Sequence, residues 1–429
     1  MKRVLIITYY WPPSGGSGVQ RWLKFVKYLR EFGYEPIVYT PANPEFMAVD
    51  SSLEKEIPEG IEVIKRAIFE PYSLYKFIKG KKGETLKPGF ISDTGYLSLF
   101  IRSNFFIPDP KKFWIKPSVR YLKSYLINNR IDAVVSTGPP HSMHLIAEKL
   151  SRDSGIPWLA DFRDPWTKMY NFKYMGYTSI VKRILARLER RVVAGADAVV
   201  TVSSTIAKEL QQWRDKVDVI TNGYDTSDFD TQSSEPVNSF SIVYTGLFVK
   251  TQNPVILWDV LSEMCSKNEV FAKDLKICLI GNIDSSITQN IKEKSLSPYL
   301  QQQGYLSHEQ VVGYQKKGAL LLLAGGEEPE SAGIMTGKFF EYLAAGRPIL
   351  GFGPKGGDMD TALDESGHGK MFAYNNRDGV REWIGEMYQR YLDGKLVSIK
   401  GDIEKYSRRE LTAGMASILD RIVNNKENK

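Results

Sequence analysis

The stretch EEPESAGIMTGKFFEYLAAGRPILGFG, residues 327–353, holds the densest pattern of the chain. It follows ALLLLA (319–324), an apolar run that predicts a buried strand. An acidic loop with glycine comes next, then a helix that begins at Thr336-Gly337-Lys338 and ends at Gly346, and then a second strand. Strand, loop, helix and strand form the repeating unit of a parallel α/β sheet, so this stretch predicts an α/β fold.

The start of this helix suits a diphosphate. The N–H groups and the positive dipole end at a helix N-terminus attract anions, and Thr336, Gly337 and Lys338 add a hydroxyl, an open backbone and a cation. Glu341 lies one turn further on the face of Lys338, where its carboxylate could accept two hydrogen bonds from a ribose diol. The alternative for Lys338 and Glu341 is a salt bridge on a capped helix.

The same alternation of strands and helices extends outward to both ends of the chain. A polar stretch at 225–239 interrupts it and reads as a linker. We therefore expect a first domain over 1–224, a second over 240–405, and an amphipathic helix within 406–429 that returns to the first domain. The predicted strands are KRVLIIT (2–8), EPIVYT (35–40), DAVVSTG (132–138), PWLADF (157–162), DAVVTVS (197–203), VDVITNG (217–223), FSIVYTG (240–246), LKICLIGN (275–282), GALLLLAGG (318–326), RPILGFG (347–353) and GKMFAY (369–374).

The bulk composition is that of a globular cytoplasmic protein. The 429 residues are 42% hydrophobic, enough for two or three domains. Cys265 and Cys278 have neither metal-ligand nor disulfide spacing, which favours buried thiols in a reducing compartment. The apolar run near the N-terminus is too short for a signal peptide, and no run approaches the ~20 residues of a membrane span.

The net charge of +7 is unevenly distributed. Residues 1–200 carry 31 Lys and Arg against 19 Asp and Glu, whereas the remainder carries 26 against 31. The excess centres on 70–125, where 11 basic residues alternate with 12 aromatic ones. A solvated basic face and contact with anionic lipid or a lipid-linked phosphate are both open interpretations. Nucleic acid is not expected, because no recognised binding motif accompanies the charge.

A glycine cluster, Gly15-Gly16-Ser17-Gly18, lies between the first strand and a helix at 18–32. The dinucleotide fingerprint requires a third glycine and an acidic residue after the second strand. Arg21 occupies the third glycine position and Thr40-Pro41 ends the second strand, so the fingerprint fails. No Gly-Lys-Ser/Thr closes a P-loop either. The cluster still suits a phosphate at a helix N-terminus, with a purely structural turn as the alternative.

These segments together resemble the retaining glycosyltransferases of GT-B architecture, the group 1 or family 4-like assemblage. FFEYLAAGRPIL (339–350) matches the family's most specific segment. VVTVSS, VITNGYD, IVYTGLF and ICLIGN match weaker landmarks in the right order. The resemblance covers nearly the whole chain. It implies two Rossmann-like domains facing across a cleft, with the acceptor in the first domain and the nucleotide sugar in the second.

The resemblance also implies roles for individual residues. Lys338 and Lys250 would stabilise the leaving diphosphate, and His141 and Asp161 would position sugar and acceptor. The remaining donor-binding residues implied are Gly15, Gly16, Ser17, Gly18, Thr245, Gly246, Thr336, Gly337 and Glu341.

The chain departs from the family pattern at several points. The first of the family's two glutamates is missing, because Gly333 stands at its position. Lys250 is the one clear cation where a basic pair is usual. His141 is displaced from the common histidine position, and a core or loop histidine is its alternative.

Asp161, Arg163 and Asp164 in ADFRDPW form a polar group at a strand end. Arg163 and Asp164 are acceptor-side candidates, and mutual structural pairing is the alternative for all three. Asp358 and Asp360 spell a DMD metal motif but open a helix, where acidic residues favour the dipole. No metal and no cofactor are expected.

The sequence therefore predicts a retaining glycosyltransferase that moves a sugar from a nucleotide sugar to a polysaccharide, lipid-linked or other glycan acceptor. Its expected setting is the cytoplasmic face of the cell membrane, with peripheral contact to anionic lipid. A sugar-nucleotide epimerase of the same architecture and a non-catalytic carbohydrate- or membrane-binding relative are the alternatives.

Overall fold

The chain folds into two compact units in this computed structural model. Unit 1 comprises Met1–Thr221 with Arg408–Lys429, and unit 2 comprises Asn222–Ser407. Positions 230–238 of the expected linker lie outside the described residues. The structure describes residues 1–45, 49–70, 96–169, 172–229, 239–396, 399 and 401–427.

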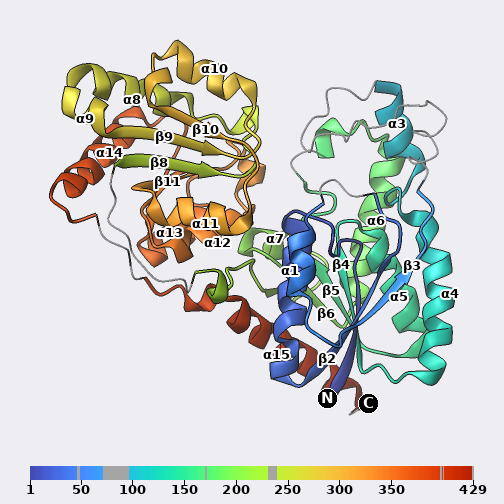
Figure 1. Cartoon of the computed structure of the whole chain (residues 1–429). Coiled ribbons are helices and arrows are strands. Elements are labelled where there is room, and N and C mark those ends of the chain that lie inside the picture. Colours follow the sequence, from blue (N-terminus) through green and yellow to red (C-terminus); the bar gives the residue numbers. More distant parts are fainter. Residues whose placement is uncertain are drawn as a thin grey trace. The chain divides into compact units, whose positions relative to one another are not determined.

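Unit 1 is built on a seven-stranded sheet in the order β3-β2-β1-β4-β5-β6-β7, with every described pairing parallel (Figure 1). The central strands β1, β4 and β6 are short and rich in β-branched residues, as is typical of parallel strands covered on both faces. Their bounds are β1 Lys2–Ile7, β2 Tyr34–Pro41, β3 Glu62–Arg66, β4 Ala133–Gly138, β5 Trp158–Phe162, β6 Ala198–Thr201 and β7 Asp218–Val219.

Helices cover both faces of this sheet. Val4 and Ile6 of β1 face a core shared with α1 and α15, whereas Leu5 and Ile7 face α4, α5 and α6. The expected return of the C-terminal helix is confirmed, because α15 packs beside α1 (Figure 1). The helix bounds are α1 Ser17–Leu29, α3 Tyr96–Phe105, α4 Lys112–Asn128, α5 Ser142–Ser154, α6 Ser179–Gly195, α7 Ser204–Leu210 and α15 Arg408–Glu427.

Unit 2 repeats the plan with a six-stranded parallel sheet in the order β10-β9-β8-β11-β12-β13. Its two faces are covered by α8, α10 and α14 on one side and by α12 and α13 on the other. The strands are β8 Phe240–Thr245, β9 Leu275–Ile280, β10 Leu300–Gln303, β11 Leu320–Ala324, β12 Ile349–Phe352 and β13 Gly369–Phe372. The helices are α8 Val255–Lys267, α9 Glu269–Asp274, α10 Ser285–Glu293, α11 His308–Lys317, α12 Gly337–Ala345, α13 Asp358–Ser366 and α14 Arg377–Leu392.

Both sheets have the Rossmann strand order. Successive strands are first added on one side of the first strand of each unit and then on its other side. Ligands of open α/β sheets bind at the carboxyl ends of the strands at this switch point. In unit 1 the switch lies between β1 and β4, and in unit 2 between β8 and β11. No helix of the described residues is long and apolar enough to cross a bilayer.

Candidate active site

The switch point of unit 2 collects the predicted donor-binding residues. Thr245 ends β8 and Gly246 follows it, while Thr336 caps α12 and Gly337 is the first residue of that helix. Gly246 has a φ of 98°, a conformation that favours glycine. A Cβ on Gly246 would lie 3.6 Å from Lys338 Nζ, so the lysine reaches the backbone at the end of β8. These contacts join the two segments that the sequence predicts for diphosphate binding.

Lys338 is held by an aromatic pair. Its Nζ donates to the hydroxyl of Tyr244 at 2.6 Å and lies 3.8 Å from the ring centroid. The Tyr244 ring stacks on Phe248 at 3.8 Å, and its hydroxyl donates to the carbonyl of Leu247 at 2.6 Å. Burial lowers the pKa of Lys338 to about 7, and the charge of Glu341 opposes that shift only in part. The amino group of Lys338 is therefore held in position before any ligand arrives.

Glu341 is held by two side chains of α11. Gln315 Nε2 donates to Glu341 Oε2 at 3.1 Å, and His308 Nε2 lies 3.4 Å from Oε1. Burial alone would raise the pKa of Glu341, but these two neighbours and the charge of Lys338 hold it below its ordinary value. Gln315 Nε2 also donates to Thr245 Oγ1 at 3.2 Å, which links α11, α12 and β8. The carboxylate is thus ionised and oriented.

His308 and Gln315 were not predicted as site residues. Gln315 is fully buried, and its Oε1 has no hydrogen-bond partner among the described residues. Its position in an ordinary amphipathic helix gives no sequence signal, because the role depends on α11 packing against α12. A buried glutamine in that helix becomes informative only once the tertiary arrangement is known.

The N-terminus of α12 has an unused hydroxyl. The side chain of Thr336 forms no capping bond, and its Oγ1 is buried without a partner among the described residues. Most buried polar atoms are paired, so an orphan at this place is notable. Together with the free N–H groups of the first turn, it offers donors for an anion.

Lys250 lies on the short turn Lys250–Gln252 that follows β8, and it is exposed. Hydrogen bonds from Ser286, with a contribution from the charge of Lys250, hold the pKa of Asp284 below its ordinary value. Lys250 is therefore near the start of α10, at the carboxyl end of the same sheet. Its predicted role at the diphosphate stays a prediction.

In unit 1, the glycine cluster forms the start of α1. Gly16 is the N-cap residue with a φ of 95°, Gly15 precedes it, and Ser17 is the first residue of the helix. The carbonyl of Gly18 accepts from Arg163 Nη1 at 2.6 Å, and a Cβ on Gly18 would lie 2.8 Å from that nitrogen. The absence of a side chain at Gly18 thus admits the guanidinium.

Arg163 joins two loops of unit 1. Its Nη2 donates to the carbonyl of Pro139 at 2.9 Å, which ties the glycine cluster to the loop between β4 and α5. The guanidinium also lies 5.6 Å from the ring centroid of Tyr10. Asp164 is 3.9 Å away, and its side chain is 45% exposed. Asp164 therefore remains a candidate for acceptor contact, whereas Arg163 is largely used within the protein.

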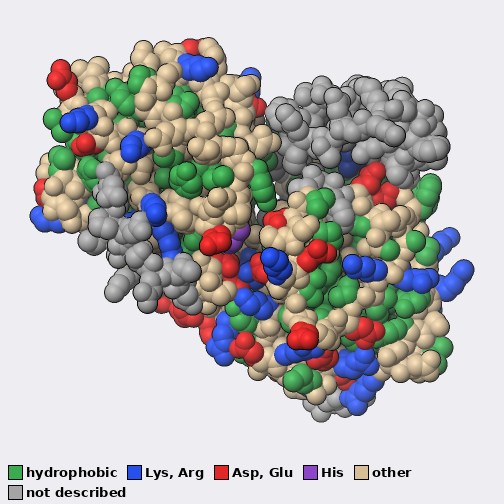
Figure 2. All heavy atoms as spheres, in the orientation of Figure 1, with side chains coloured by type: hydrophobic (Ala, Val, Ile, Leu, Met, Phe, Trp, Pro, Cys, Tyr) green, Lys and Arg blue, Asp and Glu red, His purple; other side chains and the backbone are tan. Residues whose placement is uncertain are grey.

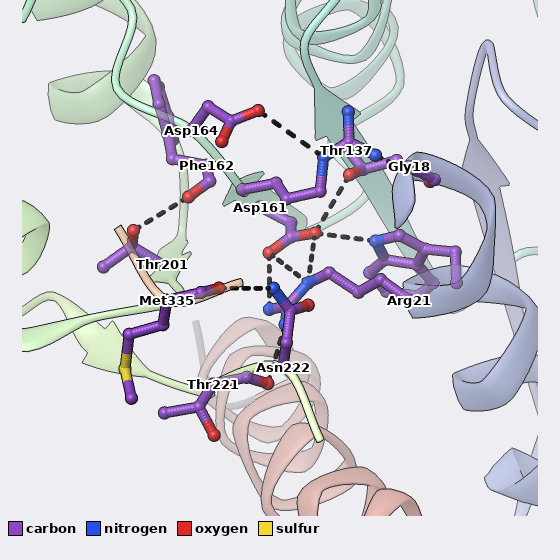
Figure 3. Close-up of polar contacts among 12 residues, drawn as sticks. Gly18, Arg21, Thr137, Asp161, Phe162, Asp164, Thr201, Thr221, Asn222 and Met335 are labelled. Atoms are coloured by element: carbon purple, nitrogen blue, oxygen red, sulfur yellow. Dashed lines mark hydrogen bonds and ion pairs between the residues drawn. The ribbon is translucent and has the colours of Figure 1, made fainter. Parts of the chain in front are cut away.

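For Asp161, the contacts in the structure favour the structural alternative over direct positioning of sugar or acceptor. Its side chain is fully buried and paired with Arg21, whose Nη2 lies 2.9 Å from Oδ1 (Figure 3). Trp22 Nε1 and Thr137 Oγ1 donate to Oδ2 at 2.7 and 3.0 Å. Arg21 Nη1 also donates to the carbonyl of Thr221 at 2.9 Å. With both oxygens used, Asp161 ties α1, β4 and β5 together and presents no atom to a ligand.

His141 is buried at the start of α5, in the loop that Arg163 joins. Its ring stacks on Trp166 with centroids 4.3 Å apart and planes 7° apart. Burial is the main cause that lowers the pKa of His141 well below 6.5, with the charge of Arg163 contributing. The imidazole is therefore neutral at pH 7, so one of its nitrogens donates a hydrogen bond and the other accepts one, and the ring supplies no charge.

No group of three or more His, Cys, Asp or Glu among the described residues is arranged to hold a metal ion. In the DMD sequence, Asp360 accepts from Lys355 Nζ at 2.8 Å and from the Gly356 N–H at 2.7 Å. The Asp360 carboxylate thus holds the loop that precedes α13, in agreement with the interpretation that these acidic residues serve the start of the helix.

Residues 88–228 match the model of Glycosyltransferase Family 4. No curated protein matches the sequence. Solved structures are similar in fold across the whole chain. HepE of Anabaena, in complex with UDP and glucose, has a TM-score of 0.59 at 13% identity, with 100% of both chains covered. A TarM mutant of S. aureus, in complex with Fondaparinux, alpha-GlcNAc-glycerol and UDP, has 0.62 at 11%, with 98% of this chain and 100% of that one covered.

A Listeria monocytogenes protein described as a UDP-N-acetylglucosamine 2-epimerase is also similar, with a TM-score of 0.57 at 9% identity and 99% and 98% of the two chains covered. The architecture alone therefore does not separate transferase from epimerase. The family match and the two Rossmann-type sheets with the returning helix agree with the predicted architecture. The chain therefore has the GT-B fold of these solved structures, and its residues 88–228 are similar to Glycosyltransferase Family 4.

Proposed function

We propose that the donor is a nucleoside diphosphate sugar bound at the switch point of unit 2. The observation that carries this proposal is the grouping of the Lys338 ammonium, the oriented Glu341 carboxylate and the orphan Thr336 hydroxyl around the start of α12. Phosphates would lie against Lys338 and the first N–H groups of α12, and a ribose would bind Glu341. Uridine is the first nucleoside to test, because two similar structures contain UDP.

In this proposal, the site works by stabilising the leaving group. The bond between the anomeric carbon and the diphosphate oxygen breaks while the acceptor oxygen bonds to the same face of that carbon. The departing phosphate takes the acceptor proton, so no protein base is required. Negative charge grows on the diphosphate, and preorganised donors such as Lys338 and the helix N–H groups are most effective against such growing charge. Lys250 would add a second cation.

His141 and the glycine cluster would act on the sugar rather than on the nucleotide. His141 is neutral and fixed by its stack on Trp166, so it could give one hydrogen bond to a sugar hydroxyl. Gly15 to Gly18 would allow the sugar and diphosphate to approach the backbone at the start of α1. Such positioning lowers the entropic part of the barrier.

For the acceptor we propose a polysaccharide precursor or lipid-linked glycan at the cytoplasmic membrane face. The support is the basic and aromatic segment 70–125, part of which lies outside the described residues. Figure 2 shows basic and acidic side chains interspersed over the described part of one face.

A panel of nucleotide sugars, incubated with and without lipid-phosphate acceptors, tests the reaction. We expect release of nucleoside diphosphate that depends on acceptor, with the sugar recovered on it. Glu341→Gln should weaken nucleoside diphosphate binding at least tenfold, because it removes a charge-assisted contact of about 1.5–3 kcal/mol. Asp378→Asn, an exposed site on α14, serves as the control. Epimerised donor without transfer, or unchanged affinity for Glu341→Gln, would contradict the proposal.

A further inference from the structure

Two adjacent buried histidines in unit 1 have unpaired nitrogens. His141 precedes α5, and His144 lies in its first turn. Nδ1 of His141 and Nε2 of His144 are both buried, with no hydrogen-bond partner among the described residues. An unsatisfied buried polar atom costs about 1–3 kcal/mol, so two such atoms on neighbouring rings call for a physical explanation.

Gly138 brings these two nitrogens to one place. A Cβ built on Gly138 would lie 2.6 Å from His144 Nε2 and 3.0 Å from His141 Nδ1. Both nitrogens therefore border the space that Gly138 leaves without a side chain, and the two ring centroids are 5.8 Å apart. This spacing allows the rings to share a hydrogen bond after a small adjustment, or through one water.

The proton on His144 is placed by a chain of donors. Trp158 Nε1 donates to Ser136 Oγ at 2.8 Å, and Ser136 Oγ lies 2.9 Å from His144 Nδ1. An indole N–H can only donate, so Ser136 accepts from Trp158, and His144 Nδ1 is the one acceptor among the described residues that its hydroxyl proton reaches. Burial lowers the pKa of His144 to about 3, against the opposing charge of Asp161, so the ring is neutral. Its single proton is therefore on Nε2.

We propose that His144 donates its Nε2 proton to Nδ1 of His141, directly or through one water, and so fixes His141 as the tautomer that carries its proton on Nε2. His144 is then a positioning residue, and His141 presents a donor rather than an acceptor to the sugar. This inference rests on the proposed function for its catalytic meaning. The pairing of the two rings can be measured independently of catalysis.

Nitrogen NMR on the full chain labelled with ¹⁵N-histidine tests the pairing. The chain has four histidines, and single substitutions assign their signals. We expect His141 and His144 both to be neutral at pH 7 with the proton on Nε2. A proton on Nδ1 of His141 in the wild-type protein would overturn the proposal, even where every variant below fails to fold.

Two variants test the direction of the effect. His144→Leu removes the donor, and Ser136→Ala removes the group that fixes the His144 proton. Both should convert His141 to a mixture of tautomers. His368→Leu is the matched control, because it removes another fully buried histidine, in unit 2, and should leave the His141 signals unchanged. An unchanged His141 tautomer in His144→Leu would overturn the proposal.

Kinetics separate this inference from the proposed function. His144→Leu should lower kcat for sugar transfer at least tenfold, while nucleoside diphosphate affinity stays within twofold because unit 2 is untouched. His144→Gln, whose amide can donate, should recover part of kcat. A lowered kcat with an unchanged tautomer would overturn the inference. A changed tautomer with unchanged kcat would support the pairing and instead reject the role of His141 in transfer.

Discussion

At the scale of single residues, Lys338 combines burial with a site built for a charged ligand. Its pKa of about 7 means that about half of the empty molecules carry the charge at neutral pH. Its nearby groups include Tyr244 and the backbone at Gly246, and Glu341, one turn along the helix, is the charged group that acts on its pKa. A diphosphate would favour the protonated form, so its binding would take up a proton wherever the empty lysine is neutral.

We therefore expect nucleoside diphosphate affinity to fall as pH rises above 7, by up to tenfold per pH unit. The sign follows because a lowered pKa leaves the empty site neutral at high pH. Calorimetry between pH 7 and 9.5 measures this dependence. Lys338→Arg, which remains charged throughout, should bind with little dependence on pH. A flat wild-type profile would contradict the predicted lysine titration.

Asp161 shows at the same scale how a polar residue in a site motif can serve structure. Asp161→Asn removes the charge facing Arg21 and should cost about 3–5 kcal/mol of unfolding free energy, because it leaves a buried charge unpaired. Asp164→Asn, three residues on with a 45% exposed side chain, should change stability little. Urea unfolding of both variants measures the difference. Equal stabilities would reject the structural assignment.

The pH dependence of this pair has a defined sign. Burial by itself would raise the pKa of Asp161, but the charge of Arg21 and the hydrogen bonds from Arg21, Trp22 and Thr137 hold it below its ordinary value. Its stabilising contribution is therefore complete at neutral pH. It is lost as pH falls below the unfolded value of about 3.9.

At the scale of elements, hydrophobic pattern predicts most of the fold. The predicted strands that correspond to β1, β8 and β11 are confirmed, because each is a buried apolar run. Two edge strands were missed. β3 reads EVIKR and β10 reads LQQQ, and both are largely exposed. A polar edge strand carries no apolar period, so it is recognised only by its hydrogen bonding to a neighbour.

Part of the candidate site was predictable from the sequence, namely the part whose residues are neighbours along the chain. Thr336, Gly337, Lys338 and Glu341 are consecutive or one turn apart, so local sequence places them together. Gln315 and His308 come from a different helix, and the partners of Asp161 come from α1 and β4. Contacts that depend on tertiary packing leave no pattern that a single sequence reveals.

The start of α1, where Gly16 is the N-cap residue, is predicted to admit the sugar close to the backbone. Gly16→Val should abolish transfer and leave nucleoside diphosphate affinity nearly intact, because a branched side chain would block approach to the backbone in unit 1. Gly33→Val is the matched control, because Gly33 follows the short turn Arg30–Phe32 that comes after the C-terminal end of α1. Gly16 and Gly33 have φ values of 95° and 82°, with open space around both. The two variants therefore share the backbone strain and differ in position.

Turnover and nucleoside diphosphate affinity are measured for both glycine variants, with circular dichroism to verify folding. A Gly16→Val protein that folds and transfers at the wild-type rate would reduce the cluster to a structural turn. Equal losses of turnover in both variants would point to strain as the cause.

Helix α15 is predicted to stabilise unit 1 through its packing against α1. Met415 is fully buried in the core that α15 shares with α1, and Lys2 pairs with Asp420 of this helix at 2.7 Å. Met415→Ala should cost about 2–5 kcal/mol of unfolding free energy in unit 1. Ser417→Ala, exposed on the same helix, is the control. Calorimetric scans should show a lowered transition for unit 1 alone, and a loss confined to unit 2 would contradict the packing.

At the scale of the whole molecule, charge is divided between the two halves of the sequence. Residues 1–200 are basic by 31 to 19, and the rest is acidic by 31 to 26. A donor site in unit 2 and an acceptor side in unit 1 would account for this division, provided that the acceptor is presented at an anionic surface. Each Lys or Arg near such a surface contributes on the order of 1 kcal/mol, and salt weakens the attraction.

Charge reversal at Lys79, Lys81 and Lys82, which lie outside the described residues, should therefore reduce co-sedimentation of the protein with anionic liposomes. Three such changes alter the attraction by several kcal/mol, so binding should fall at least tenfold, and raised salt should have the same effect on the wild-type protein. Reversal of Lys273, Lys276 and Lys292, exposed in unit 2, changes the net charge equally and serves as the control. Equal losses in both triple variants would indicate attraction by net charge. Binding that ignores both salt and reversal would leave the segment as a solvated basic face.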